Sequence, residues 1–440
     1  MDVTVCQVQN IEDMGTGDKP EKPHQKEMRL AMYDDIIQKE KPEAVLAMMK
    51  NIKNKDEVFC FFDLNGLYKI AEQCLKMGFK NGNFPLKEDR ELESNREAGQ
   101  ELVEKYYKNL NIIDFEQFST IDEGIAFIDQ SPDQWALKSC GDDGDTVVPR
   151  TPITQFNHNA IKRALKKDKG DYEQQGFILQ KRLLDAYEIT PEAIWYNGKL
   201  VCASIDLESK PRGPFDTGAM CDCSMNLIIK ISEKDPIFDM YFPKYIQEMA
   251  KKRIGLFIWD AGSLWWKKPN ASLYKAYFTE FCSNRFGWFS LITEMAMAKS
   301  ATDYIQDIVD GKNPLIYKFG VAITAQAPND NKHKLEKETM EWLESVDKDV
   351  WVQEMKKDEG GDVINATNHW DKAVFTGQGN TIQEAVDRVY DVAEKFYFND
   401  YEYRGKEDFL SHSYTSSIMN RYDFLKKQGL IKTPVLTLKR

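Results

Sequence analysis

The sequence predicts an α+β fold in which strands and helices build two or three domains. The chain has 440 residues, of which 42% are hydrophobic and 30% charged, and this composition is ordinary for a globular protein with a sizeable core. Short apolar runs predict buried strands, and segments with apolar residues at helical spacing predict helices. Both kinds of segment recur along the chain, which indicates a mixed fold.

The N-terminal part predicts one small α/β layer. The run "VFCFFDL" at 58–64 is apolar, ends in an acid and is typical of a buried strand. Residues 66–78 have helical periodicity and end at a glycine, which is a common helix stop. A further helix is predicted at 84–107, whereas the first 25 residues are polar and are expected to be irregular.

The middle of the chain predicts a helix and then mainly strands. Residues 120–131 form a helix that a threonine caps, with an acid three residues later. Residues 134–149 are predicted as strand, glycine-containing turn and strand. Several strands follow at 176–205, with Asn197-Gly198 as a hairpin turn. A Gly/Pro-rich loop is predicted at 211–224.

The last part of the chain alternates between the two element types. A helix is predicted at 236–252, followed by strands at 254–266 and 273–281. Strand-rich segments at 317–327 and 363–377 precede a strongly amphipathic helix at 381–396, and the final forty or so residues are charged and mostly helical.

Charge and cysteine content exclude several classes of protein. The net charge of −12 argues against a broad nucleic-acid footprint, although a small basic pocket is still allowed. The eight cysteines and five histidines show no metal-binding spacing, and no Ser/His/Asp or Cys/His nucleophile arrangement is present. No signal peptide and no apolar run of the roughly 20 residues that a membrane span requires is found. A cytoplasmic protein is expected.

Lys138 is the first candidate functional residue. It ends the predicted strand "WALK" before the turn "SCGDDGDTVV", so its ammonium group and the amides of Gly141 and Gly144 could cover the same polyphosphate oxygens. Three aspartates in this turn, at 142, 143 and 145, oppose phosphate binding because they add negative charge. A surface lysine beside a hairpin turn is the alternative interpretation.

The segment "ILQKRLLDAYEI" at 178–189 is a candidate nucleoside site. A base could pair with the backbone of an extended strand edge at Gln180, Lys181 and Leu183, and the Glu188 carboxylate could accept ribose hydroxyl protons. A charged strand edge without a ligand is the alternative.

Two further segments carry substrate and metal candidates. In the predicted loop at 211–224, backbone amides could approach a ligand closely. In "YFTEFCSNRFGWFS", Glu280 and Asn284 carry the hard oxygen atoms that Mg²⁺ prefers, and Asp260 could supply another. Arg285 beside them could clamp a carboxylate or phosphate. A charged turn at a strand end is the alternative.

Taken in order, these segments resemble the ATP-grasp superfamily, and within it the phosphoribosylamine–glycine ligases. "DEGIAFIDQSPDQWALKS" is similar to the helix and strand that lead into the family's phosphate-binding lysine, and "GFILQKRLLDAYEI" resembles its hinge and ribose-binding segment. "GPFDTGAM" resembles the Gly-Pro-Asn-Thr-Gly-Gly-Met loop, and this implies Asp216, Thr217, Gly218 and Met220 as substrate-binding residues. "EFCSNRFG" resembles the Glu-Phe-Asn-x-Arg-Phe-Gly magnesium motif. The C-terminal order of strand pair, Gly-x-Gly-Asx-Thr turn, helix and Tyr-Arg pair is also similar, so the resemblance covers roughly residues 90–405.

The resemblance implies an ATP-grasp fold, with two α+β subdomains that hold ATP between them. The implied domains are a reduced N-terminal α/β domain at 1–90, an ATP-grasp domain at 91–298 with a lid at 112–182, a ligase-like C-terminal domain at 299–405, and a helical tail at 406–440. Gln180 and Lys181 stand where the family has acids. The segments "GPFDTGAM" and "EFCSNRFG" are each one residue longer than the family motifs that they resemble. The family's asparagine therefore corresponds to Cys282 or Asn284, and the preference of magnesium for oxygen favours Asn284.

The implied activity is that of a C–N ligase that uses ATP and Mg²⁺, with Mn²⁺ as a substitute metal. A carboxylate, such as that of glycine, would form an acyl phosphate and then an amide with an amine on a nucleotide, sugar phosphate or modified DNA base. Lys138 and Arg285 would act on the phosphoryl group. The open alternatives are a housekeeping phosphoribosylamine–glycine ligase of purine synthesis, a virus- or plasmid-borne relative, and a degenerate nucleotide-binding scaffold. The expected partners are small molecules, with no membrane.

Overall fold

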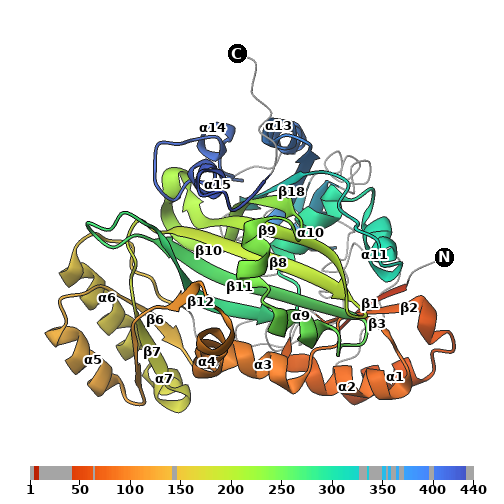
Figure 1. Cartoon of the computed structure of the whole chain (residues 1–440), viewed down its shortest axis with the longest axis horizontal. Coiled ribbons are helices and arrows are strands. Elements are labelled where there is room, and N and C mark those ends of the chain that lie inside the picture. Colours follow the sequence, from red (N-terminus) through yellow and green to blue (C-terminus); the bar gives the residue numbers. More distant parts are fainter. Residues whose placement is uncertain are drawn as a thin grey trace. The chain divides into compact units, whose positions relative to one another are not determined.

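The chain forms two compact units in the computed structural model, which describes residues 4–8, 42–62, 65–140, 146–326, 334–335, 349–352, 355–357, 363–365, 371–395 and 401–432. The first unit consists of Met1–Lys87, Ile189–Asp260 and Cys282–Arg440, and the second of Glu88–Glu188 and Ala261–Phe281 (Figure 1). Strands β11 (Leu256–Trp266) and β12 (Lys275–Ser283) each run from one unit into the other.

The N-terminal layer of the first unit is a small parallel sheet in the order β1-β2-β3. Its strands are β1 (Thr4–Val8), β2 (Val58–Phe62) and β3 (Asn81–Gly82), accompanied by helices α1 (Pro42–Lys50) and α2 (Tyr68–Met77). The predicted strand and helix at 58–78 are confirmed, and α2 ends at Gly78, whose φ of 97° is the left-handed conformation that glycine adopts without strain. Strand β1 lies in the first 25 residues, which were expected to be irregular, so that expectation was wrong for residues 4–8; the others of this segment lie outside the described residues.

The main sheet of the first unit is antiparallel and has the order β15-β18-β13-β10-β9-β8. Its strands are β8 (Tyr187–Tyr196), β9 (Lys199–Gly213), β10 (Thr217–Ile231), β13 (Phe319–Gln326), β15 (Val350–Val352) and β18 (Asp371–Gly379). The predicted hairpin turn at Asn197-Gly198 is confirmed, because both residues have positive φ between paired Tyr196 and Lys199. A separate small sheet has the order β14-β17-β16, from Lys334–Leu335, Val363–Asn365 and Met355–Lys357.

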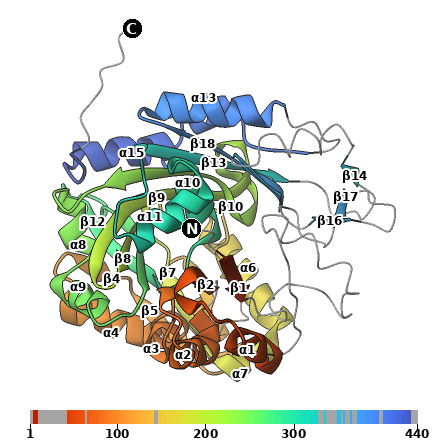
Figure 2. The same ribbon diagram turned by 90° about the vertical axis from the view of Figure 1, so that its right-hand side faces the viewer.

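Helices α10 (Trp288–Met297) and α13 (Ile382–Ala393) cover opposite faces of this sheet, and α11 (Ala301–Val309) follows α10 (Figure 2). Each helix approaches the sheet at a glycine. A Cβ on Gly320 would lie 2.6 Å from the Met297 sulfur of α10, and a Cβ on Gly377 would lie 2.4 Å from the Ala385 carbonyl oxygen of α13. Helix α13 confirms the predicted amphipathic helix and begins with a capping box of Thr381 and Glu384.

The predicted helix at 236–252 is in fact two helices, α8 (Pro236–Tyr241) and α9 (Lys244–Ala250). Pro243 separates them, because proline has no N–H to continue a helical hydrogen-bond ladder. Of the tail at 406–440 that was predicted as mostly helical, the described residues 406–432 contain α14 (Lys406–Phe409) and α15 (Ile418–Lys427), with a non-helical stretch at 410–417 between them.

The second unit contains an antiparallel sheet in the order β5-β7-β6, from Phe115–Phe118, Phe177–Lys181 and Trp135–Ser139. Helices α5 (Ile121–Gln130), α6 (Thr154–Lys167) and α7 (Lys169–Gln175) pack on one face of it. The predicted helix at 84–107 is divided into α3 (Lys87–Ser94) and α4 (Arg96–Tyr106), because the side chain of Asn95 accepts the N–H groups of Glu97 and Ala98 and starts a new helix. Strand β4 (Leu110–Ile112) pairs in parallel with β12 within this unit.

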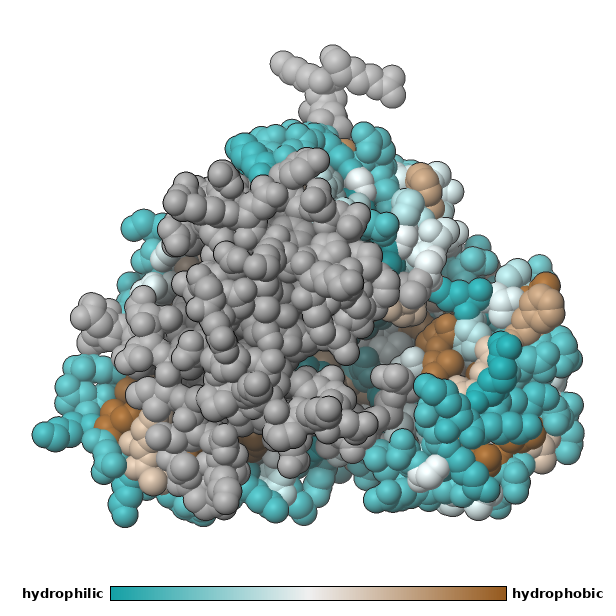
Figure 3. Space-filling model, turned by 180° about the vertical axis from the view of Figure 1, so that it is seen from behind, coloured by the Kyte–Doolittle hydropathy of each residue, from teal (hydrophilic) through white to brown (hydrophobic). Residues whose placement is uncertain are grey.

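The visible surface is mainly polar, as the content of charged residues leads one to expect. Figure 3 shows the face opposite to that of Figure 1, where the described residues are mainly hydrophilic and the apolar areas are small and separate. None of the helices in the described ranges combines the length and the apolar character that crossing a bilayer requires.

Candidate functional site

Lys138 and Gln180 lie on the same face of the β5-β7-β6 sheet in the second unit. Lys138 pairs with Ile178 and Ala136 pairs with Gln180, so the two polar side chains are diagonal neighbours on adjacent strands. The alternate residues Leu137 and Leu179 belong to the hydrophobic core with α5, α6 and α7. Because side chains alternate between the faces of a strand, Lys138 and Gln180 point away from these helices.

This face is largely covered, since the side chains of Lys138 and Gln180 are only 7% and 5% exposed. Burial of a lysine is unusual unless a partner or a ligand compensates its charge. The structure therefore brings together two of the residues that the sequence singled out. Gly141 and Gly144 lie outside the described residues.

Strand β7 is the central strand of its sheet, and this corrects the expectation of an open edge at residues 180–183. The backbone N–H of Lys181 donates to the Asp114 carbonyl at 2.8 Å, and that of Arg182 donates to the Gln134 carbonyl at 2.9 Å. Backbone pairing with a nucleoside base would therefore have to occur beyond Arg182, where Leu183 follows the strand, whereas the Gln180 side chain stays on the face that carries Lys138. The Lys181 ammonium donates to Asp133 at 2.7 Å, so its side chain is held by the protein. Glu188 lies on β8 and is partly exposed.

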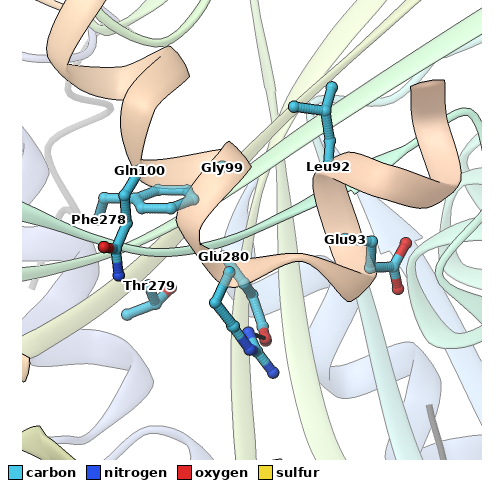
Figure 4. A pocket seen from close by; sticks show the side chains of 8 residues that line it. Leu92, Glu93, Gly99, Gln100, Phe278, Thr279 and Glu280 are labelled. Carbon is cyan, nitrogen blue, oxygen red and sulfur yellow. Dashed lines mark hydrogen bonds and ion pairs between the residues drawn. The ribbon is translucent and has the colours of Figure 1, made fainter. Parts of the chain in front are cut away.

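Glu280 lies on β12 in the second unit, where the Nη1 atom of Arg96 on α4 donates to its Oε2 at 2.8 Å. The Glu280 side chain is 45% exposed. Figure 4 shows this carboxylate and Phe278 beside α4, at a pocket lined by Leu92, Glu93, Arg96, Gly99, Gln100, Phe278, Thr279 and Glu280. The pocket volume of about 10 Å³ is room for about one water molecule, so this pocket is too small for a nucleotide.

Asn284 is held by the protein in the first unit. Its backbone N–H donates to the Ile258 carbonyl at 2.8 Å, its Oδ1 accepts from the Ile258 N–H at 3.4 Å, and its φ of 53° is left-handed. The residue is fully buried. The Asn284 side chain would have to leave this position to bind a metal. This does not favour Asn284 over Cys282 as the counterpart of the family's metal-binding asparagine. Neighbouring Arg285 donates from Nη2 to the Cys282 sulfur at 3.3 Å.

The donor atoms fit Mg²⁺ only in part. Across the described ranges, no group of three or more His, Cys, Asp and Glu side chains could hold a metal. Mg²⁺ that is bound mainly through phosphates and water needs only one or two protein carboxylates. The half-exposed Glu280 carboxylate suits that role once its ion pair with Arg96 is broken. Asp260 on β11 is only partly exposed and belongs to the first unit, so its role as a ligand stays a prediction.

The predicted loop at 211–224 is a β-hairpin tip rather than a long loop. Strand β9 continues to Gly213, a single 3-10 turn spans Pro214–Asp216 (η4), and β10 begins at Thr217. Asp216, Thr217, Gly218 and Met220 are thus at or near the start of β10. Burial alone would raise the pKa of Asp216, but hydrogen bonds from Ser209, Ser416 and Arg404 lower this pKa below its ordinary value.

A cluster of buried acids under α10, which the sequence reasoning missed, is the other notable polar group of the first unit. Glu192 on β8, Asp206 on β9 and Glu294 on α10 are each at most 3% exposed. Asp206 accepts from Ser290 at 2.7 Å and from Asn226 at 3.2 Å, and Glu294 accepts from Tyr304 at 2.6 Å. Glu192 Oε1 and Asp206 Oδ1 have no hydrogen-bond partner among the described residues. The available signal was that each acid has apolar neighbours in the sequence, Ala193 and Ile194 after Glu192 and Ile205 and Leu207 on either side of Asp206.

Comparisons with known proteins show the fold. No protein-family model and no curated protein sequence matches the chain. The structure of phosphoribosylamine–glycine ligase from Thermotoga maritima is similar to it with a TM-score of 0.56 and 16% identity, over 83% of this chain and 88% of that one. The biotin carboxylase domain of 2-oxoglutarate carboxylase from Hydrogenobacter thermophilus, solved with MgADP, ADP and bicarbonate, has a TM-score of 0.52 and 12% identity, over 88% and 82%.

Both similar structures are ATP-grasp proteins, so the fold expected from the sequence motifs is confirmed. The structural similarity establishes the fold, and at identities of 16% and 12% it does not extend to the reaction or its substrates.

Proposed function

We propose that this chain, which has the ATP-grasp fold, is an ATP- and Mg²⁺-dependent ligase that joins a carboxylate to an amine. The observation that carries the proposal is the placement of Lys138 and Gln180 on one buried face of the β5-β7-β6 sheet, away from its helices. A lysine and an amide on such a face suit the phosphates and the base of a nucleotide. The name of the ligase from Thermotoga maritima supports the same reaction class.

The proposed reaction has two steps. A carboxylate oxygen attacks the γ-phosphorus of ATP, the bond to the β-phosphate oxygen breaks, and ADP leaves. The amine nitrogen then attacks the acyl carbon, phosphate leaves, and the amine loses a proton as the amide forms. The protein contributes mainly positioning and neutralisation of charge.

Each candidate residue has a role in this scheme. Lys138 would hold phosphate oxygens, and Arg285 would stabilise the transferring phosphoryl group. Bound Mg²⁺ would neutralise the phosphates, held by Glu280 with Asn284 or Asp260 as further candidates. The backbone of the hairpin tip from Asp216 to Met220 would face the carboxylate. Leu183 and Glu188 would contact the nucleoside, while Gln180 contacts the base.

The substrates are proposed only by class. An amino acid such as glycine would supply the carboxylate, and a nucleotide, sugar phosphate or modified DNA base would supply the amine. The net charge of −12 favours a small amine over duplex DNA. Turnover with only glycine and phosphoribosylamine would identify the housekeeping ligase of purine synthesis.

A second candidate function is a nucleotide-binding module without turnover. The pairing of Glu280 with Arg96 and the full burial of Asn284 favour it, because both predicted metal ligands are engaged by the protein. Such a module would bind ATP and release no ADP.

An assay of acyl-phosphate formation separates the two candidates. The purified protein is mixed with Mg²⁺, ATP, single amino acids and hydroxylamine, which converts an acyl phosphate to a hydroxamate and phosphate. We expect ADP and hydroxamate in equal amounts, and a loss of about 100-fold or more in Glu280→Gln. The exposed Glu248, which pairs with Lys251, provides the control Glu248→Gln. ATP binding without ADP release would leave only the module, and full activity in Glu280→Gln would remove Glu280 from the site.

A further inference from the structure

The β9–β10 hairpin tip has a backbone conformation that the local sequence does not explain. Phe215 and Asp216 both have left-handed φ angles, of 55° and 58°. A bulky residue in this conformation is strained, and glycine would adopt it without cost. Phe215 gains little from burial in return, since it is 53% exposed. Strained residues persist where surrounding contacts enforce them, and they concentrate at functional sites.

Arg404 lies in the C-terminal segment, residues 404–416, and helps to hold the strained backbone of the tip in place. The residue is 2% exposed. Its Nη1 atom donates to Asp216 Oδ1 at 2.8 Å and to Ser209 Oγ at 2.6 Å, and its Nε donates to Asp408 Oδ2 at 2.6 Å. Ser416 donates to the other oxygen of Asp216. Both oxygens of the Asp216 carboxylate are therefore engaged inside the protein.

Asp408 and Tyr414 hold the neighbouring residue. The backbone N–H of Phe215 donates to Asp408 Oδ1 at 3.0 Å, and the Tyr414 hydroxyl donates to the same oxygen at 3.0 Å. The rings of Phe215 and Tyr414 meet edge to face, with centroids 5.8 Å apart. Arg404 Nη2 donates to the Tyr414 hydroxyl at 2.7 Å and closes this network. The C-terminal segment thus fixes both strained residues of the tip.

We infer that Arg404 is a positioning residue that holds the hairpin tip, and that Phe215 is the specificity-determining residue that the tip presents to the substrate. The Asp216 side chain is then a structural acid, and only the backbone of this residue faces the substrate. This inference rests on the proposed function, in which the tip lies beside the reacting carboxylate. A half-exposed aromatic ring there favours a carboxylate with an apolar side group, such as valine or leucine, over glycine.

Hydrogen exchange tests the positioning role without any need for catalysis. Arg404→Lys keeps the charge but loses the branched set of donors, so the amides of residues 213–218 should exchange about 10-fold faster or more. The matched control is Arg421→Lys, because buried Arg421 donates to the carbonyl of Glu208, a β9 residue outside 213–218. Equal exchange at the tip in Arg404→Lys and in the wild type would overturn the positioning role.

Hydroxamate formation tests the specificity role. The wild type should use valine or leucine at least about 10-fold better than glycine in kcat/KM. Phe215→Gly should lower kcat/KM for valine and leucine more than for glycine and so lose this preference. Phe215→Gly also removes the strained φ, so it should be folded and at least as stable as the wild type. A wild-type preference for glycine, or an unchanged preference in Phe215→Gly, would overturn the role of Phe215.

The two failures are distinguishable. If no amino acid gives ADP or hydroxamate, the proposed function and the substrate role of Phe215 both fall, whereas the exchange result still decides whether Arg404 positions the tip.

Discussion

The buried acids Glu192, Asp206 and Glu294 show how single residues respond to their surroundings. Burial raises the pKa of Glu192 well above its ordinary value, and the nearby acids Glu294, Asp260 and Asp206 raise it further, against a smaller opposite effect of Arg285. The pKa of Asp206 is also raised well above its ordinary value, chiefly by burial. The folded protein therefore favours the protonated form of these carboxyl groups.

This preference gives a pH dependence of stability with a definite sign. Above the unfolded pKa of a glutamate, about 4.3, the folded state binds more protons than the unfolded state. The free energy of unfolding then falls as the pH rises, up to the raised pKa of the folded state.

We predict that Glu192→Gln reduces this fall, because the amide has no charge to bury. The melting temperature of the variant should match or exceed that of the wild type at about pH 8. Each kcal/mol gained in the free energy of unfolding should raise it by about 2–4 °C. The difference between variant and wild type should shrink toward about pH 5. Thermal unfolding at both pH values measures it. Glu248→Gln is the control, because Lys251 lowers the pKa of this exposed acid. The charged form of Glu248 is thus favoured in the folded state, so this substitution should change the pH dependence of stability in the opposite direction. Parallel pH curves for Glu192→Gln and the wild type would contradict the account.

At the scale of secondary structure, the contact of helix α13 with β18 depends on one small residue. A Cβ on Gly377 would lie 2.4 Å from the Ala385 carbonyl oxygen and 2.6 Å from the Val389 nitrogen, and both are helix backbone atoms. These atoms can move away only if the helix as a whole shifts.

We therefore expect Gly377→Ala to lower the free energy of unfolding by about 1–3 kcal/mol, as overpacked cores do. Denaturant unfolding measures this loss. Gly170→Ala is the matched control, because a Cβ at Gly170 meets no atom within 4 Å. Equal stability of Gly377→Ala and the wild type would show that α13 does not pack as closely as described.

Secondary structure was largely predictable where the signal is local. Apolar runs located β2, β11 and β12, and the glycine at Gly78 located the end of α2. The two helix breaks also had local signals, in Asn95 and Pro243, that a purely periodic interpretation overrides. The hairpin tip was misjudged as a loop because Gly and Pro suggested irregular backbone, while the pairing partners of β9 and β10 decide the strand.

The candidate site was predictable in part. Lys138 and Gln180 share a face because their strands pair, which follows from alternation once the register is known. The network of Arg404 and Asp216 joins residues 188 positions apart, so no local pattern announces it. The burial of Glu192 and Asp206 was missed because acids are seldom buried, and the α10 residue that donates to Asp206, Ser290, lies 84 positions along the chain.

At the scale of the whole molecule, the proposed machinery is divided between the two units. The second unit carries Lys138, Gln180 and Glu280, and the first carries Arg285 and the hairpin tip. The central claim is that the face of the second unit that carries Lys138 and Gln180 binds ATP. Among the residues of this chain, Lys138 carries most of that claim, because it is the buried cation on the proposed nucleotide face.

Calorimetric titration of the protein with ATP in excess Mg²⁺ tests this claim most directly. We predict saturable binding of one ATP per chain, and a Kd about 10- to 100-fold higher in Lys138→Met, which keeps the apolar stem and removes the ammonium group. Lys162→Met is the matched control, because Lys162 pairs with Asp129 on the helical side of the same unit. No binding at millimolar ATP, or equal affinity of Lys138→Met and the wild type, would contradict the account.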